Sequence, residues 1–487
     1  MIAVLLNKQD FEYDVHSLIR AFYPGVDVHI FYEETEIQEA FEKKFLILYA
    51  EDRIEITIFD ADGTQQMKDQ VEVEYYADRK ETKNHLKRLL YRMISQMKGE
   101  TLPWGTLTGI RPTKIPMAML EQGKKNVEIA QYMRETYYTS NEKTALSIAI
   151  ANRERHILKN IDYQRGYSLY VGIPFCPSIC LYCSFSSSPI GVWKNRVDDY
   201  LDALLKEIEY GAAEYADRKL DTVYIGGGTP TTLEPEQLDR LLSKLEECFD
   251  MEHVLEYTVE AGRPDSITRE KLQVLKDHHV SRISINPQTM NQKTLDLIGR
   301  RHTVEETKAA FFMAREMGFD NINMDLIVGL PGEEKAEVEE TLKEVTSLDP
   351  DSITVHSLAV KRAARLNMFK DQYKEMTFTN NMAIMDMTAQ YAMHAGMAPY
   401  YLYRQKNMAG NFENVGYAKE GKEGIYNILI MEEVQSILAL GAGASTKMVL
   451  ASDRIERIEN VKDIKNYIER IDEMIERKRQ GFMKYGK

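Results

Sequence analysis

The chain has 487 residues, and 44% of them are hydrophobic, which is enough for more than one buried core. Its formal net charge of -14 argues against a nucleic-acid-binding protein, because neutralising phosphate groups requires a surplus of Lys and Arg. No apolar run reaches the length of a membrane span, and Met1–Leu6 is too short for the core of a signal peptide. We therefore expect a cytoplasmic protein of several domains.

A regular alternation of apolar runs and amphipathic segments marks residues 165–372. The amphipathic segments have helix character: Thr303 and Glu306, for example, fit a capping box at a helix start. Six β-α units follow, which predicts an α/β fold whose parallel strands form an open sheet or an incomplete barrel. In such folds active residues gather at the carboxyl ends of the strands. The apolar runs are 168–175, 222–225, 256–261, 282–285, 321–330 and 352–358.

The regions on either side of residues 165–372 predict smaller domains. Short β-type runs such as 45–49 indicate an α+β domain over residues 1–100. Turn residues followed by helical periodicity indicate a helical connector over residues 101–164. Residues 373–487 are Met-rich and helical in pattern, and we expect a mainly helical C-terminal domain there.

Three of the four cysteines, Cys176, Cys180 and Cys183, lie close together just after the first apolar run. Thiolates suit an iron-sulfur cluster or zinc, but a structural zinc site normally needs a fourth Cys or His nearby, and this loop has none. Three ligands on a four-iron cluster would leave one iron open for a substrate or cofactor. The alternatives are a zinc site completed by a distant residue and three cysteines that merely pack. Cys248 is expected in the core.

Glycine and polar residues stand at the ends of other apolar runs. Gly226–Pro230 would let backbone groups approach a ligand closely. Glu260, Gln288 and Asp325 need a structural partner or a ligand, because burying such groups unpaired costs roughly 1–3 kcal/mol. Arg300 is suited to binding a carboxylate, although surface arginine is the ordinary alternative. We expect these residues and the cysteines at one rim of the fold.

The cysteine spacing C-x3-C-x2-C resembles the signature of the radical S-adenosylmethionine (SAM) superfamily. Over about residues 165–487 the chain resembles the oxygen-independent coproporphyrinogen III oxidase (dehydrogenase) family, in its HemZ-type branch. The motifs that carry the resemblance are Tyr170-Val-Gly-Ile-Pro-Phe-Cys176, Cys180-Leu-Tyr-Cys183, Gly226-Gly-Gly-Thr-Pro230, Arg282-Ile-Ser-Ile-Asn-Pro-Gln288, Gly299-Arg300, Asp325-Leu-Ile-Val-Gly-Leu-Pro-Gly332, Pro399-Tyr-Tyr-Leu-Tyr-Arg-Gln-Lys-Asn407 and Trp104-Gly-Thr-Leu-Thr-Gly-Ile-Arg-Pro112.

This resemblance implies a radical SAM partial (β/α)6 TIM-like barrel, a 4Fe-4S cluster on Cys176, Cys180 and Cys183, and SAM at the open iron. It implies that a SAM-derived 5'-deoxyadenosyl radical abstracts hydrogen from a propionate of coproporphyrinogen III. Loss of CO2 and an electron then leaves a vinyl group, and two such events give protoporphyrinogen IX. The implied partners are this tetrapyrrole and an electron donor that the sequence does not identify. Tyr170 is the implied catalytic residue, and the implied SAM contacts are Tyr170, Tyr182, Gly227, Gly228, Thr229, Glu260, Gln288, Arg300, Asp325 and Ala359.

Two positions depart from many relatives: Gly172 stands in place of a His, and Phe185 in place of a further Cys. Neither supplies one of the three cluster ligands, so the departures concern the substrate and the number of SAM molecules. One alternative function is a haem-binding or haem-delivering protein on the same fold, and another is radical chemistry on a different tetrapyrrole. Candidate haem-iron ligands are His302, His356 and His394, and candidate cations for substrate carboxylates are Lys361, Arg362, Arg365 and Arg404.

Overall fold

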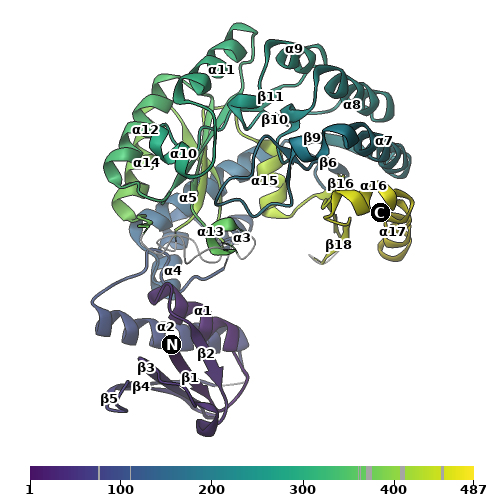
Figure 1. Ribbon diagram of the computed structural model, residues 1–487. Helices are drawn as coiled ribbons and strands as arrows, with labels where there is room; N and C mark the ends of the chain where they lie inside the picture. Colours follow the sequence, from purple (N-terminus) through teal and green to yellow (C-terminus); the bar gives the residue numbers. More distant parts are fainter. Residues whose placement is uncertain are drawn as a thin grey trace. The chain divides into compact units, whose positions relative to one another are not determined.

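The computed structural model describes residues 1–74, 77–109, 111–359, 361, 364–368, 376–405, 412–450 and 454–486. The chain divides into two compact units, Met1–Asn152 and Arg153–Lys487 (Figure 1). The division expected from the sequence, with boundaries near residues 100, 164 and 372, stays a prediction. Among the described helices, none is long and apolar enough to cross a membrane.

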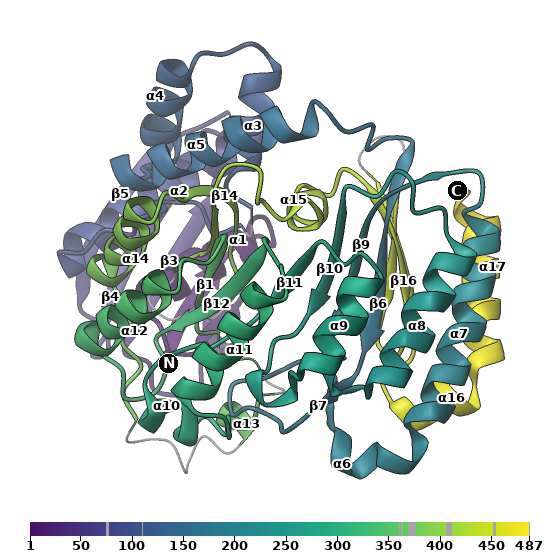
Figure 2. The same ribbon diagram turned by 90° about the horizontal axis from the view of Figure 1, so that it is seen from above.

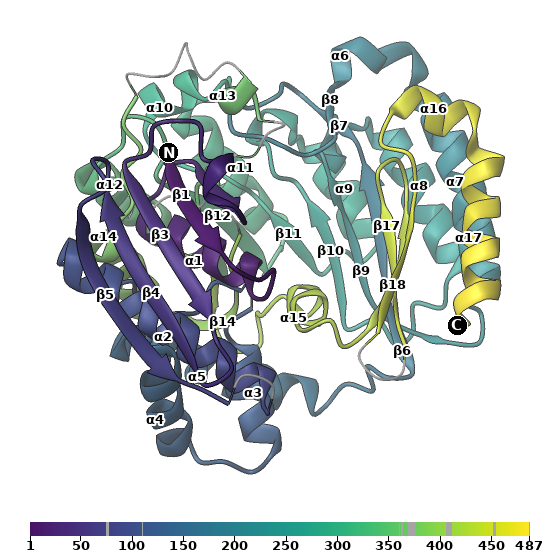
Figure 3. The same cartoon turned by 90° about the horizontal axis from the view of Figure 1, so that it is seen from below.

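The first unit contains a five-stranded sheet in the order β2-β1-β3-β4-β5. Figure 3 shows β1, β3, β4 and β5 side by side. β1 is parallel to β2 and β3, and the other neighbours are antiparallel. Its core lies between the sheet and helices α1 and α2, so the expected α+β character is confirmed. The strands are β1 (Ile2–Leu6), β2 (Val28–Phe31), β3 (Lys43–Tyr49), β4 (Arg53–Asp60) and β5 (Gln65–Glu72); the helices are α1 (Glu12–Phe22), α2 (Arg79–Lys98), α3 (Lys114–Glu121), α4 (Asn126–Tyr137) and α5 (Asn141–Leu158), which continues into the second unit.

Six parallel strands form the centre of the second unit, as the six apolar runs predict. They lie in the order β13-β12-β11-β10-β9-β6 and are largely buried, which explains why they read as continuous apolar runs. β6 and β13 do not pair with each other, so the barrel is open. The strands are β6 (Gly166–Ile173), β9 (Lys219–Gly227), β10 (Glu256–Glu260), β11 (Arg282–Ser284), β12 (Ile322–Val328) and β13 (Ser352–Ser357).

Helices that connect these strands lie along the outer side of the curved sheet (Figure 2). The predicted capping box at the start of α11 is present: the Thr303 hydroxyl accepts from the backbone N–H of Glu306, and the Glu306 carboxylate accepts from that of Thr303. The helices are α7 (Val197–Glu214), α8 (Pro235–Cys248), α9 (Arg269–Asp277), α10 (Gln292–Leu297), α11 (Val304–Glu316) and α12 (Lys335–Ser347), with the short α6 (Ile190–Trp193) and α13 (Arg365–Met368).

The C-terminal region supplies helices, as expected, and also strands that extend the sheet at both edges. β16 pairs in parallel with β6, and β15 pairs antiparallel with β13. α15 contacts both β9 and β14, so it crosses the inner side of the open barrel. The strands are β14 (Ala398–Tyr403), β15 (Asn414–Ala418), β16 (Ser436–Leu440), β17 (Ser445–Val449) and β18 (Ile455–Glu459); the helices are α14 (Met382–His394), α15 (Ile425–Glu432), α16 (Ile464–Glu469) and α17 (Ile471–Tyr485).

A buried ion pair fastens this C-terminal region to α7. Lys478 of α17 and Glu207 of α7 are both fully buried, with Nζ 2.8 Å from Oε1. The same carboxylate accepts from the backbone N–H of Gly441, the amide of Asn460 and the hydroxyl of Tyr467. The charge of Glu207 is therefore fully partnered, and the loop after β16 is held against α7.

Candidate active site

The three cysteines lie on a loop that leaves the carboxyl end of β6. The loop is closed by two short paired strands, β7 (Phe175–Cys176) and β8 (Ser188–Pro189). It is tied to the rest of the unit through Leu181, whose backbone N–H donates to the carbonyl of Ile298 at 2.9 Å. Cys180 is buried, whereas Cys176 and Cys183 are partly exposed. The sulfurs thus occupy the predicted edge of the sheet.

Burial shapes the chemistry of these thiols. It raises the pKa of both Cys176 and Cys183 above the usual range, since it disfavours the thiolate. The hydroxyl of Thr229 offsets part of this effect by donating to Sγ of Cys176 at 3.6 Å. Metal ligation would stabilise the thiolates, because it replaces the proton with positive charge.

The glycine segment after β9 forms the neighbouring wall. The backbone N–H groups of Gly228 and Thr229 donate to the carbonyls of Ile173 and Phe175, both at 2.7 Å, so this segment lies directly beside the cysteine loop. Gly227 has φ +105°, a conformation that favours glycine. A Cβ atom at Gly228 would collide with the carbonyl oxygens of Phe175 and Ile173. Close backbone packing therefore explains these glycines locally.

Glu260 lies at the end of β10, next to a stack of tyrosine rings. Its carboxylate accepts from the hydroxyl of Tyr224, whose ring stacks between those of Tyr170 and Tyr426. Burial raises the pKa of Glu260 to about 7, although the Tyr224 hydrogen bond works in the opposite direction. Tyr170 and Glu260 are therefore brought together through Tyr224.

Asp325 and His356 lie close together on the adjacent strands β12 and β13. The Nε2 atom of His356 is 3.7 Å from Oδ2 of Asp325, and the amide of Asn323 donates to Oδ1 at 2.7 Å. Burial alone would raise the pKa of Asp325, but the hydrogen bonds from His356, Asn323 and Thr354 together lower it. Asp325 is thus a partnered carboxylate that keeps its charge.

Gln288 follows β11 in a conformation rare for a residue with a side chain, with φ +67°. Its backbone is fixed by two bonds at 2.9 Å, from its N–H to the carbonyl of Asp325 and from the N–H of Ile327 to its carbonyl. The side-chain oxygen Oε1 is buried without a hydrogen-bond partner among the described residues. A buried acceptor of this kind is suited to a ligand that donates a hydrogen bond.

Arg300 is buried in the wall between the cysteine loop and β11. Its guanidinium donates to the carbonyls of Gly262 and Asn286, at 2.8 and 2.6 Å, and to the hydroxyl of Tyr182 at 3.3 Å. Tyr182 is thereby held against this wall. Carboxylate binding by Arg300 stays a prediction: its terminal nitrogens have backbone and tyrosine partners, whereas Nε is buried without a hydrogen-bond partner among the described residues.

Sequence reasoning missed Arg263, which follows β10. It is 3% exposed and donates to Sγ of Cys180 at 3.8 Å. A lone arginine in Ala261-Gly-Arg-Pro-Asp265 carries no distinctive spacing. Its position three residues after Glu260, at a strand end, was the available signal.

The remaining predicted residues are dispersed around this edge. Ala359, Lys361 and Arg365 follow β13, and Arg404 is buried after β14. Arg362, and residues 110, 406 and 407 of the two HemZ-like motifs, lie outside the described residues. Of the candidate haem ligands, His302 is fully buried, His394 is exposed, and His356 is partly exposed beside Asp325.

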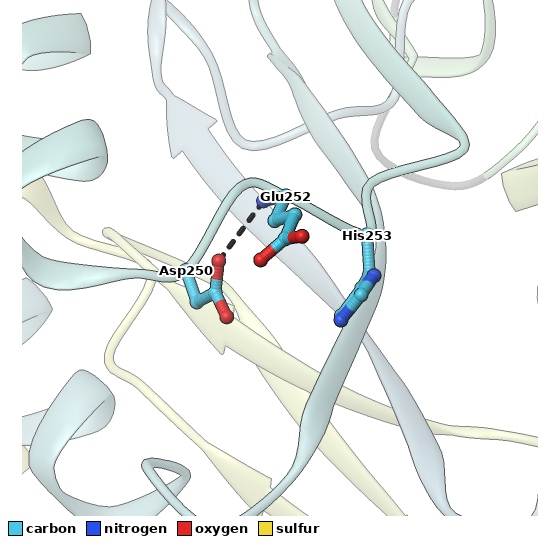
Figure 4. A group of neighbouring side chains, drawn as sticks. All are labelled: Asp250, Glu252 and His253. Atoms are coloured by element: carbon cyan, nitrogen blue, oxygen red, sulfur yellow. Dashed lines mark hydrogen bonds between the residues drawn. The ribbon is translucent and has the colours of Figure 1, made fainter.

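A second group of possible metal ligands lies at the opposite edge of the sheet. Asp250, Glu252 and His253 are exposed on the loop before β10, with ligand atoms within 4.8 Å of one another (Figure 4). Figure 4 shows one hydrogen bond within this group, which the backbone N–H of Glu252 donates to the carboxylate of Asp250. This group is remote from the carboxyl ends of the strands, and we assign it no role.

The donor set on the cysteine edge fits a cluster and a polar cofactor. Three thiols are soft ligands that suit iron-sulfur clusters. The adjoining wall offers the carboxylates of Glu260 and Asp325 and Oε1 of Gln288, which has no partner among the residues that the structure describes. These oxygens suit hydroxyl or amino donors.

Comparison with known proteins supports this assignment. The model of the radical SAM superfamily matches residues 170–345. The Bacillus subtilis (strain 168) oxygen-independent coproporphyrinogen-III oxidase-like protein HemZ is 41% identical over 405 residues, covering 82% of this chain and 81% of that one. The heme chaperone HemW of the same strain is 40% identical over 195 residues, which cover 40% of this chain and 51% of that one. The solved structure of Escherichia coli coproporphyrinogen III oxidase (HemN), described as a radical SAM enzyme, is 25% identical with a TM-score of 0.53, covering 66% and 73%.

The predicted cofactors, a 4Fe-4S cluster and SAM, are those of this superfamily. The partial α/β barrel agrees with the HemN fold. The chain therefore belongs to the radical SAM superfamily and, within it, to the HemZ-type branch of the oxygen-independent coproporphyrinogen III oxidase-like proteins.

Proposed function

We propose that this protein converts coproporphyrinogen III to protoporphyrinogen IX by oxygen-independent oxidative decarboxylation. The observation that carries the proposal is one parallel sheet that carries the cysteine loop after β6 and, at β11 and β12, the buried oxygen of Gln288 and the carboxylate of Asp325, in a chain 41% identical to the HemZ protein. The HemN relative, named coproporphyrinogen III oxidase, supports the choice of tetrapyrrole.

The chain's own residues would hold the cofactors and orient the substrate. Cys176, Cys180 and Cys183 would bind three corners of the cluster. Bound together, the cluster and SAM supply a 5'-deoxyadenosyl radical that abstracts hydrogen. Around SAM, we assign hydrogen-bonding roles to Glu260, Gln288 and Asp325, and contacts to Tyr170, Tyr182, Gly227, Gly228, Thr229, Arg300 and Ala359.

The substrate step requires a propionate side chain and an electron acceptor. Removal of one hydrogen from the propionate, followed by loss of CO2 and one electron, leaves a vinyl group. A one-electron acceptor must take that electron, and a separate donor must reduce the cluster. Lys361, Arg365 and Arg404 follow β13 and β14, where their charges would attract the substrate carboxylates.

Anaerobic turnover tests this proposal. The reconstituted holoprotein is incubated with SAM, a chemical reductant and coproporphyrinogen III, and 5'-deoxyadenosine and vinyl products are quantified. The proposal requires both. Deoxyadenosine without vinyl product would refute this substrate and favour another tetrapyrrole. The variant Cys180→Ala should lose both products with the cluster, whereas Cys248→Ala, a partly exposed cysteine on α8, should keep them.

A haem-delivery function is the second candidate, since the HemW chaperone of Bacillus subtilis is 40% identical over 195 residues. His356 is the best-placed axial ligand of the three histidines considered, because it is partly exposed at the site edge. Stable haem binding that His356→Ala abolishes and His394→Ala preserves, without any vinyl product, would favour this candidate over decarboxylation.

A further inference from the structure

Arg263 makes a direct contact with a predicted cluster ligand. Its Nη1 atom donates to the carbonyl and hydroxyl oxygens of Ser178, at 3.3 and 3.1 Å, and to Sγ of Cys180 at 3.8 Å. Arg263 is 3% exposed, so water does not screen its charge. The buried guanidinium of Arg263 therefore lies directly beside the thiol of Cys180.

Asp265 fixes the orientation of this guanidinium. Its two carboxylate oxygens accept from Nε and Nη2 of Arg263, at 2.9 and 2.7 Å, in a bidentate pair. These bonds leave Nη1 turned towards Cys180. A lysine could not keep this geometry, because it lacks the planar fork.

Hydrogen bonds and positive charge beside a ligand sulfur favour the reduced state of an iron-sulfur cluster, because reduction adds negative charge. We propose that Arg263 is a positioning residue that raises the reduction potential of the cluster through its contact with Cys180. The proposal rests on the cluster, which belongs to the superfamily, and is independent of the tetrapyrrole assigned above. Inactivity towards coproporphyrinogen III would therefore leave it intact.

The test is a redox titration of reconstituted holoprotein without SAM, followed by electron paramagnetic resonance, with iron and sulfide measured for each sample. The variants are Arg263→Gln, Arg263→Lys and Asp265→Asn. Arg269→Gln is the matched control. Arg269 lies at the start of α9, its side chain is 55% exposed, and it pairs with Glu316 of α11. Its titration should match that of the unmodified protein.

In Arg263→Gln we expect normal iron content and at least a tenfold lower ratio of reduced to oxidised cluster at a fixed potential. For this one-electron couple that equals about 59 mV. Arg263→Lys should show a smaller fall, since it keeps the charge. In Asp265→Asn the ratio should not fall, because the amide oxygen can still accept one hydrogen bond from the guanidinium while the negative charge that neutralises Arg263 is lost.

Unchanged ratios in both Arg263 variants would overturn the proposal. So would a fall of equal size in Asp265→Asn, because the effect would then come from the packing of the loop. If Arg263→Gln alone fails to load iron, the ratio in Arg263→Lys decides. Failure of all three variants to load would assign Arg263 a structural role and also overturn the proposal.

Discussion

The Nε2 atom of His356 lies 3.7 Å from Oδ2 of Asp325, and the hydroxyl of Tyr403 lies 3.5 Å from the other ring nitrogen of His356. These contacts join β14, β13 and β12 by one chain of polar groups. Asn323 holds the second carboxylate oxygen of Asp325. The orientation of a proposed SAM-binding carboxylate is therefore set by residues that need not touch SAM.

Replacing His356 with Ala should weaken SAM binding without removing any proposed SAM contact. Asp325 loses a partner, so its pKa rises and its carboxylate becomes less well oriented. We expect about a tenfold increase in the Kd for SAM, equivalent to ~1.4 kcal/mol. Anaerobic equilibrium binding to the cluster-loaded protein measures this. His394→Ala, on the exposed surface of α14, is the control, and equal affinities in both variants would contradict the prediction.

Gln288→Ala should separate binding from stability. Because Oε1 of Gln288 has no partner in the described part of the chain, its loss should change the free energy of unfolding of the cluster-free protein by less than ~1 kcal/mol. SAM affinity should fall about tenfold. Asn286→Ala is a useful contrast: its Oδ1 accepts from the backbone N–H of Asp325 at 3.1 Å, so we expect a stability loss of ~1–2 kcal/mol. Denaturant unfolding distinguishes the two patterns.

The raised pKa of Glu260 predicts a pH-dependent stability. Between its ordinary value and about 7, the native protein holds a proton that the unfolded chain has released, so the free energy of unfolding falls as pH rises. Glu260→Gln lacks this titration. In the cluster-free protein, the variant should gain stability relative to wild type between pH 5 and pH 8, by at most ~3 kcal/mol. A difference that is the same at both pH values would exclude this explanation.

Lys478→Met should destabilise the protein by ~3–5 kcal/mol, because it leaves the Glu207 carboxylate buried without its counter-ion. The exposed pair of Lys206 and Asp472 also joins α7 to α17 and offers a matched control. Lys206→Met should cost less than ~1 kcal/mol, since water screens that pair. Similar losses in chemical unfolding would show that burial does not govern the two pairs.

The fold of the second unit was predictable where burial leaves a continuous pattern. β9 and β12, for example, follow from apolar runs that stand between amphipathic helices. The strands β14 to β18 did not follow, because β15 and β16 join the sheet through β13 and β6, and β6 is more than 250 residues away from β16. Runs such as Pro399–Tyr403 also carry no alternation.

The site shows the same division. Cys176, Cys180 and Cys183 are evident from spacing alone, because all three proposed ligands lie on one short loop. Arg263 was not, since its contact with Cys180 joins residues 83 positions apart through tertiary structure. The partners of Arg300 likewise come from Gly262 and Asn286, which local patterns do not connect.

The pairing of β16 with β6 has a consequence for biosynthesis. The strand that presents the cysteine loop obtains its second neighbour from residues 436–440, near the end of the chain. Until the ribosome has released that segment, β6 has an open edge, and the loop beyond it lacks one flank of its support. Stable metal loading is therefore expected only after translation of the C-terminal region, and premature termination should yield an aggregation-prone apoprotein.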